Sequence, residues 1–436
     1  MLYVSAKVYI YYGFKGGRTM LKTNRERLKQ TIELFSQIGA TENNGVTRLS
    51  LSSEDIIARN KLKEICEQLG MTVTVDDMGT MYATLPGKSD YLPIVMGSHL
   101  DSVIKGGRFD GVLGVLTALE AVQTILDEKI ELNHPLTIVN FTNEEGARFE
   151  PSLMASGVLS GKFEKEKMLA STDPEGVTFE QALKQSGYEG DIAHRLTDAH
   201  AYLELHIEQG PVLEHYKKDI GVVEGVLGMV CYDISLTGES NHAGTTPISM
   251  RKDSMFAAMH IISILQNKLK QLPDNLVYTI GRINAYPNIH TVIPNNVTFS
   301  LESRHQDPAV IQQVEQIIFD LPTEIENCAL SYTKLWSRDT VYFDPTLINA
   351  VLESTEDLGY SQRSMFSGAG HDAQFIAQYI PSTMIFVPST KGYSHREDEY
   401  TSYEECSKGA DVLVNTVLKV ANTSILKPTS TSVNPF

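Results

Sequence analysis

The sequence predicts an α/β protein in which helices cover a mainly parallel, twisted sheet and a smaller α+β domain is inserted into the chain. Two observations carry this prediction. Short apolar runs alternate with segments of helical period over residues 20–225 and again after residue 343, which is typical of a parallel sheet buried on both faces. Between them, the expected order of elements is β-α-β-β-α-β, which is typical of a ferredoxin-like sandwich.

In the larger domain, apolar runs too short for helices are expected to form buried strands. Four such runs stand out: 92–98, 135–141, 201–207 and 382–388. Helices are expected where apolar residues recur at helical spacing or follow a capping residue, over 23–39, over 111–129, near 346–358 and from about 402 to 421.

Residues 226–342 show a different pattern of apolar and polar residues. Val230, Tyr232, Ile234 and Leu236 alternate with polar residues, which indicates a strand with one buried face. The remaining elements expected here are a helix at 254–272, strands at 276–285 and 296–305, a helix at 309–321 and a strand at 329–336. We therefore divide the chain into a larger domain, 20–225 plus 343–424, and an inserted domain, 226–342.

The two ends are expected to lie outside these domains. Residues 1–19 have neither the apolar run nor the cleavage site of a signal peptide, and a capped helix pattern follows Met20 as at an ordinary protein start. We interpret them as a disordered or spurious extension, and residues 425–436 as a disordered tail.

Composition narrows the class of partner. The formal net charge of −17 argues against nucleic acid or an anionic membrane surface, because both are polyanions. No apolar run approaches the roughly 20 residues needed to span a bilayer. The four cysteines lie far apart without a CxxC pair, which favours a reducing cytoplasm and argues against cysteine metal sites.

Polar, potentially metal-binding residues follow four of the predicted strands. His99 follows the first, Glu144 and Glu145 follow the second, His206 ends the third, and His395 lies in the loop after the last. Ligands of parallel α/β sheets bind beyond the carboxyl ends of the strands. We therefore expect these side chains to converge, joined by Asp110 of the segment GSHLDSVIKGGRFDG (97–111), whose glycines allow tight turns.

Histidine and carboxylate ligands without cysteine suit Zn²⁺, Mn²⁺ or Co²⁺ as hydrolytic metals. Two such ions fit if Asp110 bridges them, and they would activate a water and stabilise an oxyanion. Asp101, two residues after His99, is expected to accept the other ring N–H of that histidine. Of the adjacent Glu144 and Glu145, one can bind metal while the other acts as general base.

Several motifs together resemble one family. They are GSHLDSVIKGGRFDGVLG, NEEGARF, ELHIEQGPVLE, GESNHAGTTPISMRKD, SGAGHDAQ and IFVPSTKGYSHREDE. Over residues 22–422 the chain resembles the amidohydrolases that include allantoate amidohydrolases, N-carbamoyl-L-amino-acid hydrolases and β-ureidopropionases. This group is a branch of the superfamily of aminoacylase and carboxypeptidase G. The resemblance implies a di-zinc peptidase-like fold, with 226–342 acting as a lid and as the contact of a homodimer.

The resemblance also implies roles for individual residues. The implied metal ligands are His99, Asp110 as the bridge, Glu145, His206 and His395, for two ions of zinc or manganese, with cobalt or nickel as alternatives. Glu144 would be the general base and Asp101 a supporting acid. In the inserted domain, His242 would stabilise the oxyanion and Arg304 would bind the substrate carboxylate.

Other motif-matched residues would contact the substrate. Gln209 resembles a polar contact, and His371 would line the site in a role left open. One departure concerns a turn in which the family carries Asn thirteen residues before the arginine. Here Thr291 stands at that place, with Asn288 or His290 as its alternatives.

The sequence thus predicts a cytoplasmic, metal-dependent amidohydrolase that cleaves a C–N bond of a small ureido or carbamoyl carboxylate and releases ammonia. The sequence does not distinguish allantoate from N-carbamoyl-L-amino acids as the substrate. Two alternatives stay open: an aminopeptidase or N-acyl-amino-acid deacylase on the same scaffold, and a non-enzymatic binding homologue without metals.

Overall fold

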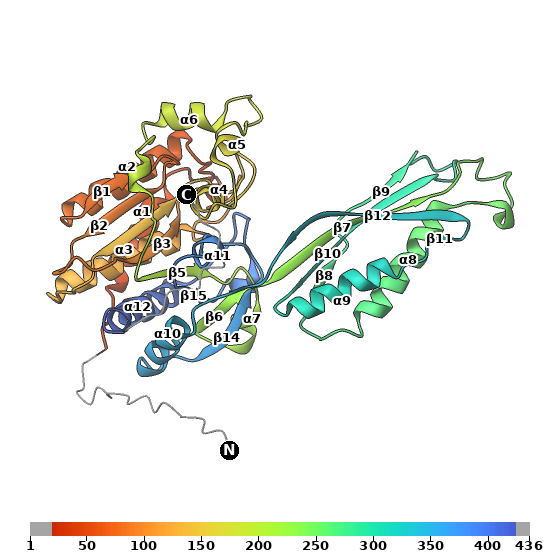
Figure 1. The fold of residues 1–436 in the computed structure, drawn as a ribbon. Helices are drawn as coiled ribbons and strands as arrows, with labels where there is room; N and C mark the ends of the chain where they lie inside the picture. The colour runs from red at the N-terminus through yellow and green to blue at the C-terminus, as the bar shows by residue number, and fades with distance from the viewer. Residues whose placement is uncertain (1–19, 424–436) are drawn as a thin grey trace, which may run out of the picture.

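The computed structural model of the protein describes residues 20–423 and contains two sheets, each with its own helices (Figure 1). The expectations for residues 1–19 and for the tail at 425–436 lie outside this range. Strands β7 and β12 cross the narrow connection between the two parts (Figure 1).

The larger sheet contains nine strands. In spatial order they are β1 (Thr72–Val75), β2 (Met81–Leu85), β4 (Leu136–Phe141), β3 (Ile94–His99), β5 (Ala201–Ile207), β15 (Ser382–Val387), β6 (Ile220–Val226) and β13 (Val341–Tyr342), with β14 (Gln362–Ser367) paired to β6. The four central strands, β4-β3-β5-β15, are parallel to one another. Their carboxyl ends therefore lie at one edge of the sheet, as predicted. The pairs β1-β2, β2-β4, β15-β6 and β13-β6 are antiparallel.

Helices cover both faces of this sheet. Its helices are α1 (Arg25–Ser36), α2 (Ser53–Gln68), α3 (Val112–Asp127), α4 (Met154–Leu159), α5 (Lys165–Leu169), α6 (Phe179–Ser186), α7 (Val212–Tyr216), α10 (Pro345–Asp357), α11 (Ala373–Ile376) and α12 (Tyr403–Val420). Helices α1, α3, α10 and α12 share one apolar core with the sheet, whereas α11 packs into the core on the other face. Helix α3 is buried along most of its length, which fits its nearly continuous apolar sequence.

Along the chain, the strands of the smaller sheet come between strands β6 and β13 of the larger sheet. Its strands are β11 (Glu324–Ile325), β12 (Cys328–Arg338), β7 (Gly228–Thr237), β10 (Asn296–His305) and β8 (Val277–Thr279), with β9 (Ile283–Tyr286) also paired to β10. Helices α8 (Ser254–Leu269) and α9 (Pro308–Phe319) pack on one face, where every second residue of β10 is buried. The strand expected over 276–285 is two short strands, β8 and β9, interrupted around Gly281, a residue type that weakens strand interiors.

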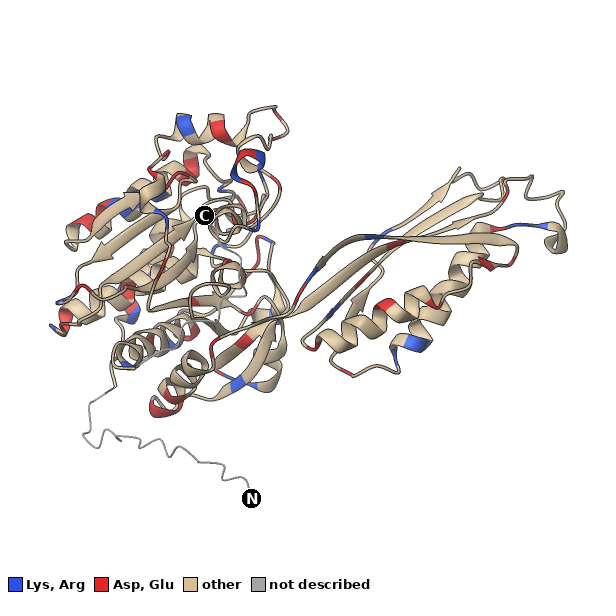
Figure 2. Cartoon of the chain, viewed as in Figure 1, with Lys and Arg blue, Asp and Glu red and all other residues tan. Residues whose placement is uncertain are grey.

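In the cartoon, basic (blue) and acidic (red) positions are both scattered over the helices and loops of the two parts (Figure 2). Among residues 20–423, no helix combines the length and apolar character that crossing a bilayer requires.

Candidate metal centre and active site

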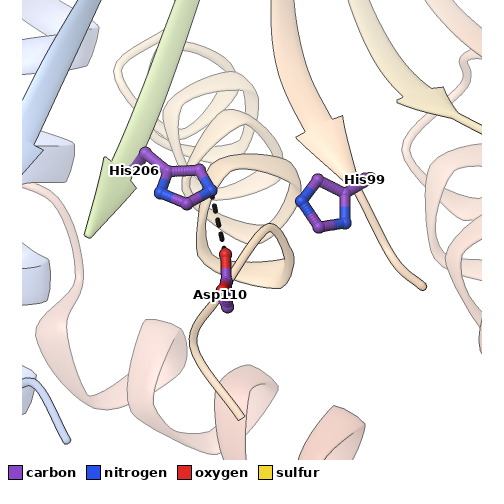
Figure 3. A group of neighbouring side chains, drawn as sticks. All are labelled: His99, Asp110 and His206. Carbon is purple, nitrogen blue, oxygen red and sulfur yellow. Dashed lines mark ion pairs between the residues drawn. The ribbon is translucent and has the colours of Figure 1, made fainter. Parts of the chain in front are cut away.

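The predicted ligands meet at the carboxyl edge of the central strands. His99 is the last residue of β3, and His206 is the last but one of β5. Glu144 and Glu145 follow β4, and His395 follows β15 after a short 3₁₀ turn (Thr390–Gly392). Asp110 lies on the loop that leads into α3, between the two strand-end histidines (Figure 3).

Two groups of three donors share Asp110. In the first, ligand atoms of His99, Asp110 and His206 all lie within 4.8 Å of one another, and in the second the same holds for Asp110, Glu145 and His395. Asp110 Oδ1 is 3.2 Å from His206 Nε2, whereas Asp110 Oδ2 is 3.3 Å from His395 Nε2. One carboxylate oxygen thus faces each group, which is the arrangement that a bridging ligand requires.

A third group, Glu204, His206 and His371, is also close enough to hold an ion. Two of its members, Glu204 and His371, already make hydrogen bonds to other side chains. Glu204 accepts hydrogen bonds from Ser98 Oγ (2.8 Å) and from the Tyr202 hydroxyl (2.9 Å), and His371 Nε2 is 2.8 Å from Ser367 Oγ. We therefore assign this group to the support of the site rather than to metal binding.

Asp110 is held by contacts from the segment that carries His395. Glu399 accepts hydrogen bonds from the backbone N–H groups of Phe109 and Asp110, each at 3.1 Å. The Ser394 hydroxyl lies 3.0 Å from both the Asp110 and the Glu399 carboxylates, and it donates to one of them. The Gln209 amide donates to Asp110 Oδ2 at 2.9 Å. Glu399 was not among the predicted residues, because 289 positions separate it from Asp110.

Asp101 is near His99 but makes a different contact from the one expected. The His99 Nδ1 atom is 2.9 Å from the backbone oxygen of Asp101, and 3.9 Å from its carboxylate. The carboxylate instead accepts the backbone N–H groups of Glu144 (3.3 Å) and Glu145 (3.2 Å). Asp101 therefore fixes both glutamates through their backbone, and its carbonyl orients the histidine ring.

The site gathers buried negative charge. Burial, followed by the charge of Asp372, raises the pKa of Glu144 well above its usual value, and burial followed by Asp110 does the same for Glu145. Burial also raises the pKa of Asp101 to about 7. Carboxylates so close together and shielded from water are stable in their ionised form only beside a cation.

The pKa values of His99 and His206 shift in opposite directions because their neighbours differ. Burial lowers the pKa of His99 to about 4. Burial also opposes a charge on His206, but the hydrogen bond and charge of Asp110 outweigh it and raise the pKa of His206 to about 9. Burial would likewise raise the pKa of Asp110, yet His206 and His395 hold it well below its ordinary value. Both shifts favour a protonated His206 beside an ionised Asp110.

Strained backbone gathers around the site. Asn143, Leu153, Gln209 and His395 are non-glycine residues with φ between 56° and 57°, in the left-handed region. Such conformations cost about 1–3 kcal/mol each and persist where the surrounding structure requires them, most often at functional sites. Leu153, Gln209 and His395 line a cavity of about 250 Å³ that also contains the metal-ligand groups.

The inserted sheet supplies part of the cavity wall. Arg304, which was predicted, lines it together with Met229 and Arg338, which were not. His371 also lines the cavity, with its ring centroid 4.6 Å from that of His206.

Three predicted residues lie elsewhere. His242, Thr291 and Asn288 are absent from the cavity lining. Arg304 stands opposite Met229 near the start of β7, whereas His242 comes after Thr237, where β7 ends. At about 3.4 Å per residue, positions 229 and 237 are separated by about 27 Å.

Two of these three distant residues are near one another. The backbone N–H of Ala243 donates to Thr291 O at 3.0 Å, and His242 forms an isolated bridge with Val292. The His242 side chain is exposed, and its Nδ1 accepts the N–H groups of Gly244 and Thr245. The chain thus carries a second cluster of motif residues, far from the metal-ligand groups.

Comparisons with known proteins place the chain in a family. The model of peptidase family M20/M25/M40 matches residues 90–419. An N-carbamoyl-L-amino-acid amidohydrolase of Rhizobium meliloti is 40% identical over 92% of this chain and 97% of its own length. An allantoate amidohydrolase of Bacillus subtilis is 37% identical over 89% of this chain and 96% of its own length.

A solved structure agrees in fold. An amidase of the hydantoinase/carbamoylase family from Burkholderia multivorans superposes with a TM-score of 0.87 and 38% sequence identity, over 93% of this chain and 99% of its own. The predicted resemblance and fold class are thereby confirmed. The chain belongs to peptidase family M20/M25/M40, and among its members it is similar to the amidohydrolases that act on non-peptide C–N bonds.

Proposed function

We propose that the protein is a metal-dependent amidohydrolase that cleaves a C–N bond of a small ureido or carbamoyl carboxylate and releases ammonia. One observation carries the proposal. The donor groups that share Asp110, the free carboxylate of Glu144 and the guanidinium of Arg304 all line one cavity. The cavity thus offers cation ligands, a base and an anion-binding group to one small molecule.

The ligand groups suit two divalent ions, with zinc or manganese as the first choice and cobalt or nickel as alternatives. Support comes from the donor set, three histidines and two carboxylates with Asp110 shared, and from the burial that opposes an unpaired charge on Glu145. When bound, such ions polarise a carbonyl and make a water molecule acidic.

The residues around the ligands would carry out proton transfer. Glu144 Oε2 lies 3.4 Å from His99 Nε2, so its carboxylate borders the ligand group without belonging to it. We assign Glu144 to take a proton from the attacking water as the new C–O bond forms at the ureido carbon. Glu144 then returns this proton to the leaving nitrogen as the C–N bond breaks. For a carbamoyl amino acid this step would release the amino acid and carbamic acid, and the carbamic acid would then break down to CO₂ and ammonia.

The motif residues that lie outside the cavity could act on the substrate only in a different arrangement of the inserted domain. His242 could stabilise the oxyanion only if residues 226–342 closed over the cavity, or if a second subunit supplied this loop. We propose a homodimer through this inserted domain. Large apolar side chains near the loop support it: Ile248, Met250 and Tyr286 are 73%, 74% and 66% exposed. Patches of this kind commonly mark interaction surfaces.

Two related substrates fit equally well. N-carbamoyl-L-amino acids and allantoate both present a carboxylate and a ureido group, and the relatives described above are named for one or the other. We also propose a cytoplasmic setting, which is supported by four buried cysteines that are all free.

An ammonia assay tests the proposal. Purified protein loaded with Mn²⁺ or Zn²⁺ is compared on allantoate, ureidoglycolate, an N-carbamoyl-L-amino acid and a dipeptide. We expect ammonia from at least one ureido compound and no cleavage of the dipeptide. Hydrolysis of the dipeptide alone, detected as free amino acids, would favour the peptidase alternative instead.

A further inference from the structure

A row of three side chains crosses the inserted sheet at its connection to the larger sheet. Arg304 of β10 and Arg338 of β12 both stand opposite Met229 of β7 in the strand register. Side chains at one register position of neighbouring strands point to the same face. All three line the cavity that contains the metal-ligand groups. The wall contributed by the inserted sheet therefore carries two guanidinium groups with a thioether between them.

The two arginines have different partners. Arg304 is paired with Glu302, whose Oε1 lies 2.7 Å from its Nε and 2.6 Å from its Nη2. Arg338 bonds to neutral acceptors, Gln374 Oε1 at 2.8 Å and Leu227 O at 3.4 Å. Its Nε is buried, and no hydrogen-bond acceptor for it lies within residues 20–423. The wall thus carries two positive charges, one negative charge and one unused donor.

This arrangement is costly without an anion. Burial lowers the pKa of Arg338 to about 10; the neighbouring charge of Arg304 acts in the same direction, and the charge of Glu302 opposes both. Two like charges in a partly buried cavity repel one another, and an unpaired buried donor costs about 1–3 kcal/mol. A carboxylate between the two guanidinium groups would offset the repulsion between them.

We infer that Arg338 is a second carboxylate-binding residue, which holds the substrate carboxylate jointly with Arg304 while Met229 contacts the carbon chain of the substrate. The inference rests on the proposed function. It implies that the protein selects substrates that carry a carboxylate. The competing interpretation is that Arg338 only ties β12 to α11 through Gln374.

The two interpretations differ in selectivity. We compare kcat/KM for N-carbamoyl-L-methionine and for its carboxamide, which lacks the negative charge. For Arg338→Gln we expect the acid-to-amide ratio to fall on the order of ten- to a hundredfold, because a hydrogen bond to a charged group is lost. Most of this change should be in KM for the acid, with the carboxamide little affected. Arg338→Lys should recover part of the ratio, since it keeps the charge without the bidentate geometry.

Two control variants identify a merely structural role. Gln374→Leu removes the partner of Arg338 and should leave the ratio near that of the parent protein, and Arg363→Gln changes an exposed arginine on β14. An equal loss on both substrates in Arg338→Gln, reproduced by Gln374→Leu, would overturn the inference.

A binding experiment separates this inference from the proposed function. Metal-loaded Glu144→Gln protein, with and without Arg338→Gln, is titrated with the same acid and carboxamide. If the parent hydrolyses no ureido compound but binding favours the acid only when Arg338 is present, the proposed function fails and the inference stands. If binding does not distinguish acid from amide, or if neither binds, the inference is wrong.

Discussion

The backbone of Gly111 passes so close to the imidazole of His99 that a Cβ atom at position 111 would lie 2.2 Å from His99 Cε1 and 2.3 Å from Nε2. Gly111 also has a φ of 66°, which side chains rarely adopt. The residue just before α3 is thus the one that makes room for the ring of His99, a predicted metal ligand.

Gly111→Ala should therefore displace His99 and reduce the metal content of the purified protein. Gly359→Ala is the matched control, because Gly359 has a φ of 75° with no atom within 4 Å of the added Cβ. Gly359→Ala should lose about 1–2 kcal/mol from backbone strain, and Gly111→Ala should lose more because of the clash with His99, measured by denaturant unfolding of the chelator-treated proteins. Metal analysis should find a loss in Gly111→Ala alone, and equal metal content in the two variants would contradict this account.

Glu399→Ala should weaken metal binding about ten- to a hundredfold, the usual effect of removing a residue that orients a ligand. Glu399 holds the backbone N–H groups of Phe109 and Asp110, and so fixes the carboxylate that the two candidate ligand groups share. Glu399→Gln keeps an acceptor for these groups and should lose less. Competition with a chelator measures the affinities, and an Ala variant that binds metal as tightly as the parent would exclude this positioning role.

The strand ends could be predicted because their signals are local. An apolar run followed at once by His99, or by Glu144 and Glu145, needs no knowledge of the rest of the chain. Strands β6 and β14 escaped prediction, although both belong to the larger sheet. Strand β14 reads QRSMFS and is partly exposed, so it lacks the apolar run of a buried strand.

Arg338 could not be predicted because its place depends on long-range register. The pairing of β12 with β7 shifts between Lys334 and Trp336, and only after this shift does Arg338 stand opposite Met229. A slip of one residue would turn its side chain to the other face of the sheet. Similarly, the wrong partner was predicted for the Asp101 carboxylate because its contact with the backbone of Glu144 and Glu145 joins two separate strand ends.

Glu144→Gln should lower kcat at least about a hundredfold, since a general base contributes on this scale. Its metal content should equal that of the parent, because the two ligand groups that share Asp110 do not include Glu144. Glu175→Gln, which changes an exposed glutamate, is the control. Retained turnover in Glu144→Gln would remove Glu144 from the role of base.

Metal affinity should rise with pH up to about 9. In the metal-free protein the pKa of His206 is raised to about 9, so this ligand carries a proton below that pH, and the metal must displace it. Because the metal must displace this proton, its apparent affinity should fall about tenfold for each pH unit below 9. Competition titrations between pH 6 and 9.5, corrected for the protonation of the chelator, should show this slope and then a plateau. An affinity independent of pH between 7 and 9 would contradict the Asp110–His206 ion pair.

The most direct test is to locate the metal by anomalous X-ray scattering from crystals of the protein loaded with Zn²⁺ or Mn²⁺. We predict two peaks, one bound by His99, Asp110 and His206 and the other by Asp110, Glu145 and His395, with Asp110 contacting both. A peak at Glu204 and His371 instead, or none at Asp110, would contradict the proposed centre and the hydrolase mechanism built on it.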